Sequence, residues 1–204
     1  MTVKEIIDKI RSSVHDDQEV GYSDNVLVGY INDGYRIMRR TIADIAPLTL
    51  AETITGKFEA GSDGNISDTI TFDDKIGTFI EVIVDGKRLK QINWSDLSEL
   101  RDNGKPEYFY VLGFNRISVY PQPGECPYKL TVIKDIKLLG LDDVSPLPDD
   151  LNDFLFEYAA TRASISNEFD ISQEMTVISN IVSQVETYLN RRSPHHITVD
   201  GYWG

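Results

Sequence analysis

The sequence of 204 residues contains a single cysteine, Cys126. One thiol cannot form an intramolecular disulfide or supply the several cysteine ligands of a structural zinc site. Long hydrophobic runs are also missing, because no stretch approaches the roughly 18 apolar residues that a membrane-spanning helix needs. The first residues, Met-Thr-Val-Lys-Glu-Ile-Ile, have no apolar segment of the kind that a secretory signal carries. We therefore expect a protein that uses no membrane and works in a cytoplasm, or in a particle assembled there.

Basic residues are scarce, with 20 Lys and Arg against 33 Asp and Glu, which gives a formal net charge of -13. The excess is concentrated in residues 141–192, which hold ten acidic side chains and three basic ones. Phosphate binding needs concentrated Lys and Arg, so such a surface repels nucleic acid. The charge argues against a protein that grips DNA, although it is compatible with one that DNA slides past without specific binding.

Signatures of catalysis are absent as well. No Gly-x-Ser-x-Gly elbow, phosphate-binding loop or Gly-x-Gly-x-x-Gly motif occurs. Cys126 lies among prolines with no evident base, and the carboxylate pairs 73–74 and 142–143 stand in turn-like sequence. The sequence therefore predicts a protein that is not an enzyme and binds no cofactor. A small hydrolase that uses acidic residues is the least favoured function.

Two weak metal signals reduce to ordinary structure. Residues 61–68 resemble part of a calcium loop, but Asp68 stands where glycine is needed and Asp74 where glutamate is needed. The alternating oxygen-bearing residues there are Asp63, Asn65 and Ser67. His195 and His196 are adjacent, so in an extended chain they point in opposite directions. We expect a plain turn at 61–68 and no metal site.

Both ends of the chain carry helical periodicity. Residues 2–14 and 24–46 each place apolar side chains on one face, and Thr2 with Glu5 matches a capping box. Residues 149–168 predict a third helix. A fourth runs to residue 192 and repeats apolar residues in 4-3 steps, which is a heptad pattern. Its members are Ile171, Met175, Ile178, Val182, Val185 and Leu189. The repeat fits packing on the other helices of the subunit, or a seam between subunits.

The middle of the chain, 49–140, is rich in β-branched residues. Asp85-Gly86 predicts a hairpin that joins strands 79–84 and 88–92, and a second hairpin joins 108–112 to 117–120. Residues 128–138 supply a last strand, and three prolines, Pro121, Pro123 and Pro127, are expected to stay outside any ladder. No helix long enough for a parallel crossover lies between the strands, so the sheet should be antiparallel.

These segments predict an α+β fold with a discontinuous bundle of about four helices. Residues 1–48 and 141–192 form the bundle, 49–140 form the antiparallel insert, and 193–204 form an extended tail. The tail ends in residues that are costly to leave in water, and we expect it to dock on a partner rather than fray. These residues are Ile197, Val199, Tyr202 and Trp203.

Aromatic residues gather on the second hairpin and the last strand. They are Tyr108, Phe109, Tyr110, Phe114, Tyr120 and Tyr128. Alternating aromatics of this kind either fill a sandwich core or form a platform for a ligand. A ligand platform would make the protein a non-catalytic binding module for carbohydrate or peptide, and we keep this function as an alternative.

Three segments, in order, resemble the head-to-tail adaptor proteins of tailed bacteriophages. Residues 24–40 contain Leu-x-x-Tyr-Ile-Asn, which resembles the family's early helix. Residues 106–113 with 117–123 resemble its β insert, which ends in Pro-x-Pro. Residues 146–163 resemble the following helix, with a Leu-Pro entry and a Glu-Tyr-Ala-x-x-Arg-Ala core.

The resemblance implies a virion protein of the phage neck that is assembled in the bacterial cytoplasm. It implies a ring, commonly of twelve copies, bound beneath the portal, with the C-terminal segment docked on the portal or on a neighbouring copy. The β insert would face outward or towards the next tail component, and DNA would pass through the ring. The heptad residues and the tail are the expected interface.

Overall fold

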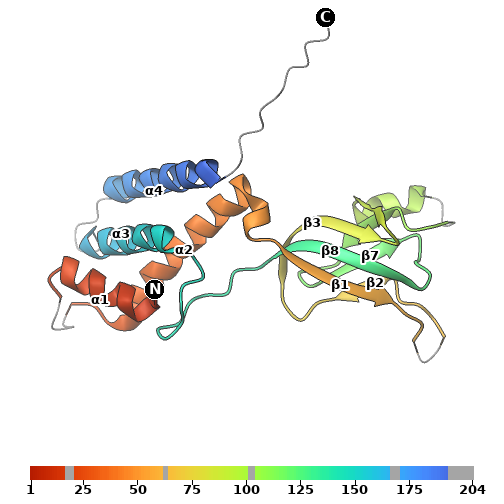
Figure 1. Ribbon diagram of the computed structural model, residues 1–204, viewed down its shortest axis with the longest axis horizontal. Coiled ribbons are helices and arrows are strands. Elements are labelled where there is room, and N and C mark those ends of the chain that lie inside the picture. The colour runs from red at the N-terminus through yellow and green to blue at the C-terminus, as the bar shows by residue number, and fades with distance from the viewer. Residues whose placement is uncertain (17–20, 62–63, 101–103, 166–170, 193–204) are drawn as a thin grey trace, which may run out of the picture. The chain divides into compact units, whose positions relative to one another are not determined.

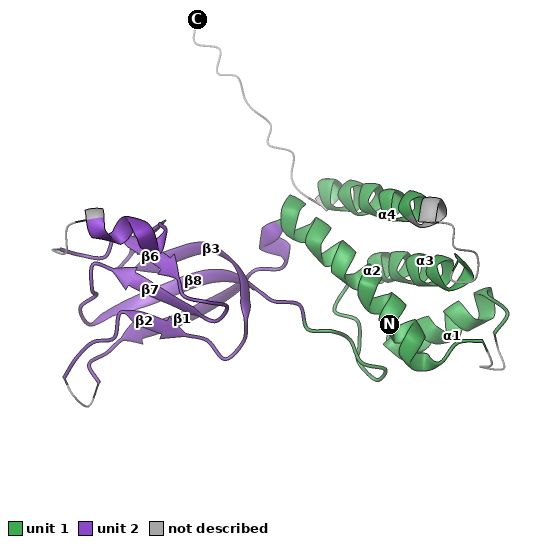
Figure 2. Ribbon diagram, turned by 180° about the vertical axis from the view of Figure 1, so that it is seen from behind, with its two compact units in different colours: residues 1–46, 137–204 green, residues 47–136 purple. Residues whose placement is uncertain are grey.

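A computed structural model describes residues 1–16, 21–61, 64–100, 104–165 and 171–192. The chain divides into two compact units, which are coloured separately in Figure 2. The helical unit consists of residues 1–46 and 137–204, and the β unit consists of residues 47–136. The chain therefore leaves the helical unit once and returns to it, so the bundle is discontinuous as the sequence predicted.

The described part of the helical unit contains four helices, which are labelled in Figure 1. They are α1 (Val3–Ser13), α2 (Asp24–Ile45), α3 (Asp149–Ile165) and α4 (Ile171–Arg192). Helix α3 packs against the other three, and α2 also packs along α4. Each helix contributes apolar side chains to one core, including Ile6, Ile10, Leu27, Ile31, Met38, Leu151, Leu155, Ile181 and Val185. The predicted helical periodicity of both chain ends is thus confirmed.

Helix α1 begins with the predicted capping box. The Glu5 backbone N–H donates to Thr2 Oγ1 at 3.2 Å, and the Thr2 backbone N–H donates to Glu5 Oε2 at 2.7 Å. Two backbone donors that would otherwise lack a partner at the helix end are satisfied in this way. The apolar face that follows buries Val3, Ile6, Ile7 and Ile10.

The β unit consists of two four-stranded sheets. The first has the order β1-β8-β3-β4 and the second β2-β7-β6-β5. Their bounds are β1 Glu52–Phe58, β2 Thr69–Thr71, β3 Ile76–Val84, β4 Lys87–Arg88, β5 Lys90–Gln91, β6 Tyr108–Val111, β7 Arg116–Tyr120 and β8 Cys126–Lys134. Two 3-10 turns, η1 (Pro47–Thr49) and η2 (Trp94–Glu99), complete the unit.

The inner faces of the two sheets enclose a core of their own. From the first sheet it takes Phe58, Ile76, Val82, Val84, Leu130 and Val132, and from the second Ile70, Phe109, Ile117 and Val119. In the first sheet, Val82 and Val84 of β3 and Leu130 and Val132 of β8 alternate with more exposed residues, which is the pattern of a two-layer sandwich. The β unit therefore has its own hydrophobic core.

Both predicted hairpins are present. Asp85 and Gly86 have φ angles of 50° and 74°, the two positive values that a type I′ turn between twisted strands requires. Strands β6 and β7 pair antiparallel from Tyr108 opposite Tyr120 to Val111 opposite Ile117.

The first hairpin is shorter than predicted. The strand paired with β3 comprises Lys87–Arg88, and the Leu89 backbone N–H donates to the Val82 carbonyl oxygen at 2.8 Å. The Leu89 side chain lies in the core with 4% of its surface exposed. Directly after the buried Leu89, the chain joins the second sheet, where Lys90–Gln91 pairs with β6. That two-residue pair is parallel, whereas the other strand pairs described in the insert are antiparallel as predicted.

Pro127 also departs from the prediction, since it lies inside β8 opposite Lys57 of β1. Proline has no backbone N–H, but its carbonyl remains available for pairing. The Asp85 backbone N–H donates to the Pro127 carbonyl oxygen at 3.0 Å. Pro127 thus joins the ladder near the start of the strand through its acceptor.

Candidate interaction surfaces

Asn32, the asparagine of the Leu-x-x-Tyr-Ile-Asn motif, binds the segment that returns from the β unit to the helical unit at residue 137. Its Nδ2 donates to the Leu139 carbonyl oxygen at 2.9 Å, and its Oδ1 accepts from the Leu139 backbone N–H at 2.8 Å. The amide pairs with the backbone much as a neighbouring strand would. Asn32 is 6% exposed and Leu139 is 8% exposed, so these hydrogen bonds are shielded from water. The motif residue therefore holds the bundle together across the insertion.

A second tie joins the first residues of the chain to the segment before α3. The Val3 backbone N–H donates to the Asp143 carbonyl oxygen at 2.9 Å, and the Ser145 backbone N–H donates to the Met1 carbonyl oxygen at 3.0 Å. Thr2 lies opposite Val144 in an antiparallel bridge. Residues 1–3 and 143–145 thus form a short β connection beside α1.

Helices α2 and α3 approach each other closely at Gly34. A Cβ atom placed on Gly34 would lie 2.8 Å from Cδ1 of Tyr158, which is the tyrosine of the Glu-Tyr-Ala-x-x-Arg-Ala motif. Tyr158 is only 4% exposed. One turn along, the Arg162 guanidinium lies 5.9 Å from the ring centre of Tyr30, in the range of a cation–π contact. The motif residues on the two helices meet one another, and this explains their spacing.

Arg11 forms a buried ionic cluster at the junction of α1 and α2. Its Nη1 lies 2.7 Å from Asp16 Oδ2, and its Nη2 lies 2.6 Å from Asp24 Oδ1. The Arg11 side chain is 6% exposed and the Asp16 side chain 9%. Asp16 also accepts the backbone N–H groups of Gly21 and Tyr22. The cluster is structural, because every described contact lies within the helical unit.

The heptad residues of α4 divide between the interior of the unit and its surface. Val185 is fully buried and Leu189 is 4% exposed, whereas Met175 is 61% exposed. Ile178 and Val182 are half-buried, and the side chain of Ile171 is outside the described set. Ile181, which the heptad pattern missed, is 3% exposed. Burial thus follows a line through Ile181, Val185 and Leu189, and a second line through Met175 faces outward.

The aromatic hairpin does not present a flat open platform. Phe109 points into the sandwich core, and Tyr110 is 6% exposed because Trp94 of η2 packs edge-on against it with ring centres 5.3 Å apart. Tyr108 and Tyr120 are half-buried, and Tyr128 packs against Phe58 at 5.2 Å. Phe114 at the hairpin tip differs from the others, because it is 76% exposed.

Among the residues that the structure describes, the candidate catalytic and metal-binding side chains do not converge. Burial, and to a smaller extent the Asp85 carboxylate, raises the pKa of the Cys126 thiol above its ordinary value, which opposes formation of a thiolate nucleophile. Asp74 pairs with Lys134 at 3.1 Å, and Asp68 accepts from the Thr69 hydroxyl. Gly61 and Asn65 close a turn between Ala60 and Ile66. Over the described ranges, no group of three or more His, Cys, Asp or Glu side chains is placed to hold a metal ion.

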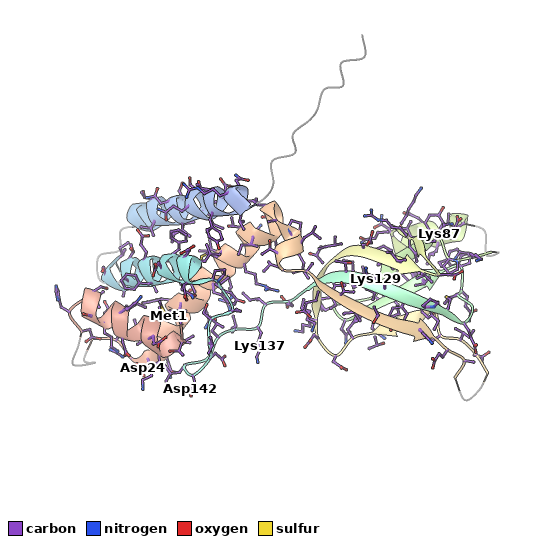
Figure 3. All side chains as sticks on the ribbon, in the orientation of Figure 1. Met1, Asp24, Lys87, Lys129, Lys137 and Asp142 are labelled. Carbon is purple, nitrogen blue, oxygen red and sulfur yellow. The ribbon has the colours of Figure 1, made fainter. Side chains whose placement is uncertain are left out.

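Acidic side chains line an open depression of about 710 Å³ between α1 and α3. They are Glu5, Asp8, Asp149, Asp150 and Asp153, with Lys9 and the Met1 amino group as the basic neighbours. The Met1 amino group lies 3.5 Å from Asp149 Oδ1. Figure 3 labels Met1 in the helical unit. The surface carries a net negative charge and has no convergent donor set.

Three predicted features lie wholly or partly outside what the structure describes. The tail residues Ile197, Val199, Tyr202 and Trp203 are in 193–204, as are His195 and His196, and Asp63 is in 62–63. Among the residues that are described, none of the helices has both the length and the apolar character to cross a membrane.

A helical bundle interrupted by a β insert is the organisation that the resemblance to phage head-to-tail adaptors implies. A family model described as SU10 adaptor protein matches residues 1–194. The chain belongs to this family, which confirms the resemblance drawn from residues 24–163 and extends it through α1. The search of curated proteins returned no match.

Proposed function

We propose that this protein forms a ring that joins the portal of a tailed phage to its tail and leaves a channel for DNA. The observation that carries the proposal is the adaptor family match over residues 1–194. The role is structural, so the protein holds components together and turns over no substrate. It acts in the virion neck after assembly in the host cytoplasm.

The ring would consist of neighbouring copies of this chain, commonly twelve in such adaptors. Closed rings need two different surfaces on each subunit, because each copy meets the next head to tail. The outward line of α4 is one such surface, since Met175 is 61% exposed and Ile178 and Val182 are partly exposed. We assign this line to the contact between copies, together with Ile171, while Val185 and Leu189 pack within the subunit.

The tail would dock on the portal. Tyr202 and Trp203 are the kind of residues that anchor interfaces, and Ile197 and Val199 alternate as in an added strand. The β unit would face the next tail component, as the family resemblance implies.

The acidic surface of the helical unit supports passage of DNA through the ring without specific binding. The helical unit exposes Asp149, Asp150, Asp153 and Glu157 along α3. Carboxylates repel phosphate, so a channel wall of this kind would keep DNA from adhering. A calculated potential on the assembled ring would contradict this assignment if the wall of the channel were basic.

The direct test mixes purified protein with the portal protein of the same phage and follows mass by light scattering and sedimentation. We expect a ring, either of the protein alone or on the portal. A chain that remains monomeric under both conditions would overturn the proposal. A monomer that assembles only on the portal would still support it, because the partner then templates the ring.

The alternative of a carbohydrate- or peptide-binding platform is less well supported. It requires exposed tyrosines on the hairpin, yet Tyr110 is 6% exposed beneath Trp94. Chemical modification of tyrosine in the assembled and free protein measures this directly. Rapid labelling of Tyr110 would restore the alternative.

A further inference from the structure

The β unit carries an exposed aromatic residue on a rigid support. Phe114 lies at the tip of the β6–β7 hairpin with 76% of its surface exposed. The Ile76 backbone N–H donates to the Phe114 carbonyl oxygen at 2.7 Å, and the Phe72 backbone N–H donates to the Asn115 carbonyl oxygen at 2.8 Å. The Asn115 side chain returns a bond to the Phe72 carbonyl at 3.2 Å. The ring is therefore held out from a tip that is fixed before any partner arrives, which lowers the entropy lost on binding.

An open groove of about 430 Å³ lies on the outer face of the first sheet. Thr55, Lys129 and Ile83 stand side by side across three strands, because Thr55 pairs with Lys129 and Lys129 pairs with Ile83. Pro127 and Lys57 form the next row, at the β3–β4 turn. Figure 3 shows Lys129 on β8. The groove thus combines an apolar floor of Ile83 and Pro127 with two lysine side chains.

The chemistry of the groove suits an aromatic ring with an acidic neighbour. An ammonium group is attracted to the face of a ring, and the apolar floor favours its edge. Beside the Phe114 tip, Asp74 is already paired with Lys134, while the Asp73 side chain is exposed. The tip also carries Lys75 and Arg116, so the match depends on the ring and Asp73 rather than on net charge.

The two features lie at opposite ends of one strand. The tip is bonded to Ile76, the first residue of β3, and the groove includes Ile83 near its last. Ile76 and Ile83 are seven residues apart in β3, which corresponds to roughly 23 Å at about 3.3 Å per residue. Phe114 therefore cannot fill the groove of its own β unit. A knob and a socket at opposite ends of one rigid unit produce head-to-tail contacts, the type that generates rings.

From this geometry we infer that Phe114 of each copy inserts between Lys57 and Lys129 of the next copy, so that the β units form a second belt of contacts in the ring. The inference rests on the proposed ring and names one of its interfaces. The occupant of the groove is a second copy of this chain.

Crosslinking in the assembled ring tests the contact. In a Cys126→Ser background, Phe114→Cys and Thr55→Cys are made singly and together, and a short bis-maleimide is added. The double variant should give a ladder of linked copies. An equimolar mixture of the two singles should stop at dimers, and each single alone should stay monomeric on a denaturing gel.

The outcomes separate the inference from the function it rests on. A ring without the Phe114–Thr55 link overturns the inference and leaves the ring intact. Dimers from Phe114→Cys alone would also overturn it, because they would mean tip-to-tip pairing. A link from Phe114→Cys to the portal or to another tail component would assign the tip to that partner instead. If no ring forms with or without portal, both proposals fail.

A matched pair of substitutions measures the strength of the contact. Phe114→Ala should raise the protein concentration needed for half-assembly at least ten-fold. Leu48→Ala removes a side chain of the same unit that is 72% exposed but lies on neither feature, and it should leave that concentration unchanged. Equal effects of the two would overturn the inference. Melting curves confirm that both variants fold, since neither residue is buried.

Charge exchange tests the polar part of the contact. Lys129→Glu and Asp73→Lys should each weaken assembly, and the double variant should recover it, because the pair is then restored with opposite signs. Failure of the double variant to recover assembly would overturn the electrostatic part of the inference.

Discussion

The Asn32 side chain supplies hydrogen-bond partners to the chain where it returns from the β insert to the helical unit. The returning chain at residues 137–148 has backbone groups that need partners once they are buried. A side-chain amide offers one donor and one acceptor on the same side, and Asn32 gives both to Leu139. The asparagine in the motif is therefore explained by the need to receive the chain when it comes back from the β unit.

Replacing Asn32 with alanine should destabilise the helical unit by about 3 kcal/mol, because the buried N–H and C=O of Leu139 both lose their partner. Chemical denaturation followed by helical circular dichroism measures this. Asn25→Ala, on the exposed first turn of the same helix, is the control and should change the stability by less than about 1 kcal/mol. Equal losses for the two variants would contradict the account.

Two glycines of α2 should respond in opposite directions to alanine. At Gly34 the new Cβ would meet Tyr158 at 2.8 Å, so Gly34→Ala should cost about 1–3 kcal/mol through overpacking. At Gly29 no atom lies within 4 Å of the new Cβ, so Gly29→Ala should gain up to about 1 kcal/mol from helix propensity. Thermal or chemical unfolding measures both changes.

A further variant tests the cause of the Gly34 effect. Combining Gly34→Ala with Tyr158→Ala should shrink the penalty of the first substitution, because the clashing ring is removed. If the losses of stability caused by Gly34→Ala and Tyr158→Ala are additive, the close approach of α2 and α3 does not explain the effect of Gly34→Ala.

At the scale of elements, helix ends and sheet crossings decide the arrangement. The capping box starts α1 where the sequence predicted it, since its partners are three residues apart. Leu89 instead moves the chain from one sheet to the other, since its side chain belongs to the sandwich core. Local signals determine the first feature, and burial between two sheets determines the second.

The capping box gives the stability of α1 a dependence on pH. The hydrogen bond from the Thr2 backbone N–H holds the pKa of Glu5 below its ordinary value of 4.5. A folded-state pKa below the unfolded one adds stability above the unfolded pKa, and this is lost as the pH falls through the folded pKa. The contribution is small, because Glu5 is fully exposed.

Comparison with Glu5→Gln isolates this effect, because glutamine keeps the capping acceptor but does not titrate. We expect the wild-type protein to lose more stability than the variant as the pH falls below 4.5. Unfolding measured at a series of acid pH values checks this. Parallel curves for the two proteins would mean that Glu5 titrates alike in both states.

At the scale of the whole molecule, two cores are built on one chain. Each has its own set of buried residues, and the chain passes between the units at residues 46–47 and 136–137. The tail, 193–204, lies outside the described residues and is assigned to a partner in the proposed function.

Deletion of residues 193–204 should leave the unfolding temperature nearly unchanged and weaken assembly on the portal. The reason is that the proposed function assigns the aromatic end of the tail to an interface with the portal. Calorimetry and co-sedimentation with portal measure the two effects separately. A large loss of stability would mean instead that the tail packs on its own subunit.

The sequence by itself determined the helices, the two hairpins and the interrupted bundle, because these depend on periodicity, caps and turn residues that are close together in the chain. It also pointed to the adaptor family through the motif around Asn32 and Tyr158. It could not reveal that these residues serve contacts with Leu139 and Gly34, which are more than a hundred residues away in the chain.

Only the tertiary structure decided which side chains face outward. The heptad pattern treats Met175 and Val185 alike, yet one is 61% exposed and the other is fully buried, because α4 packs on α2 and α3 along a line through Ile181. Likewise Tyr110 and Phe114 are both hairpin aromatics, but Trp94 covers the first, while the fixed tip of the hairpin exposes the second. Burial is set by what packs on each face, and a local pattern carries no record of that.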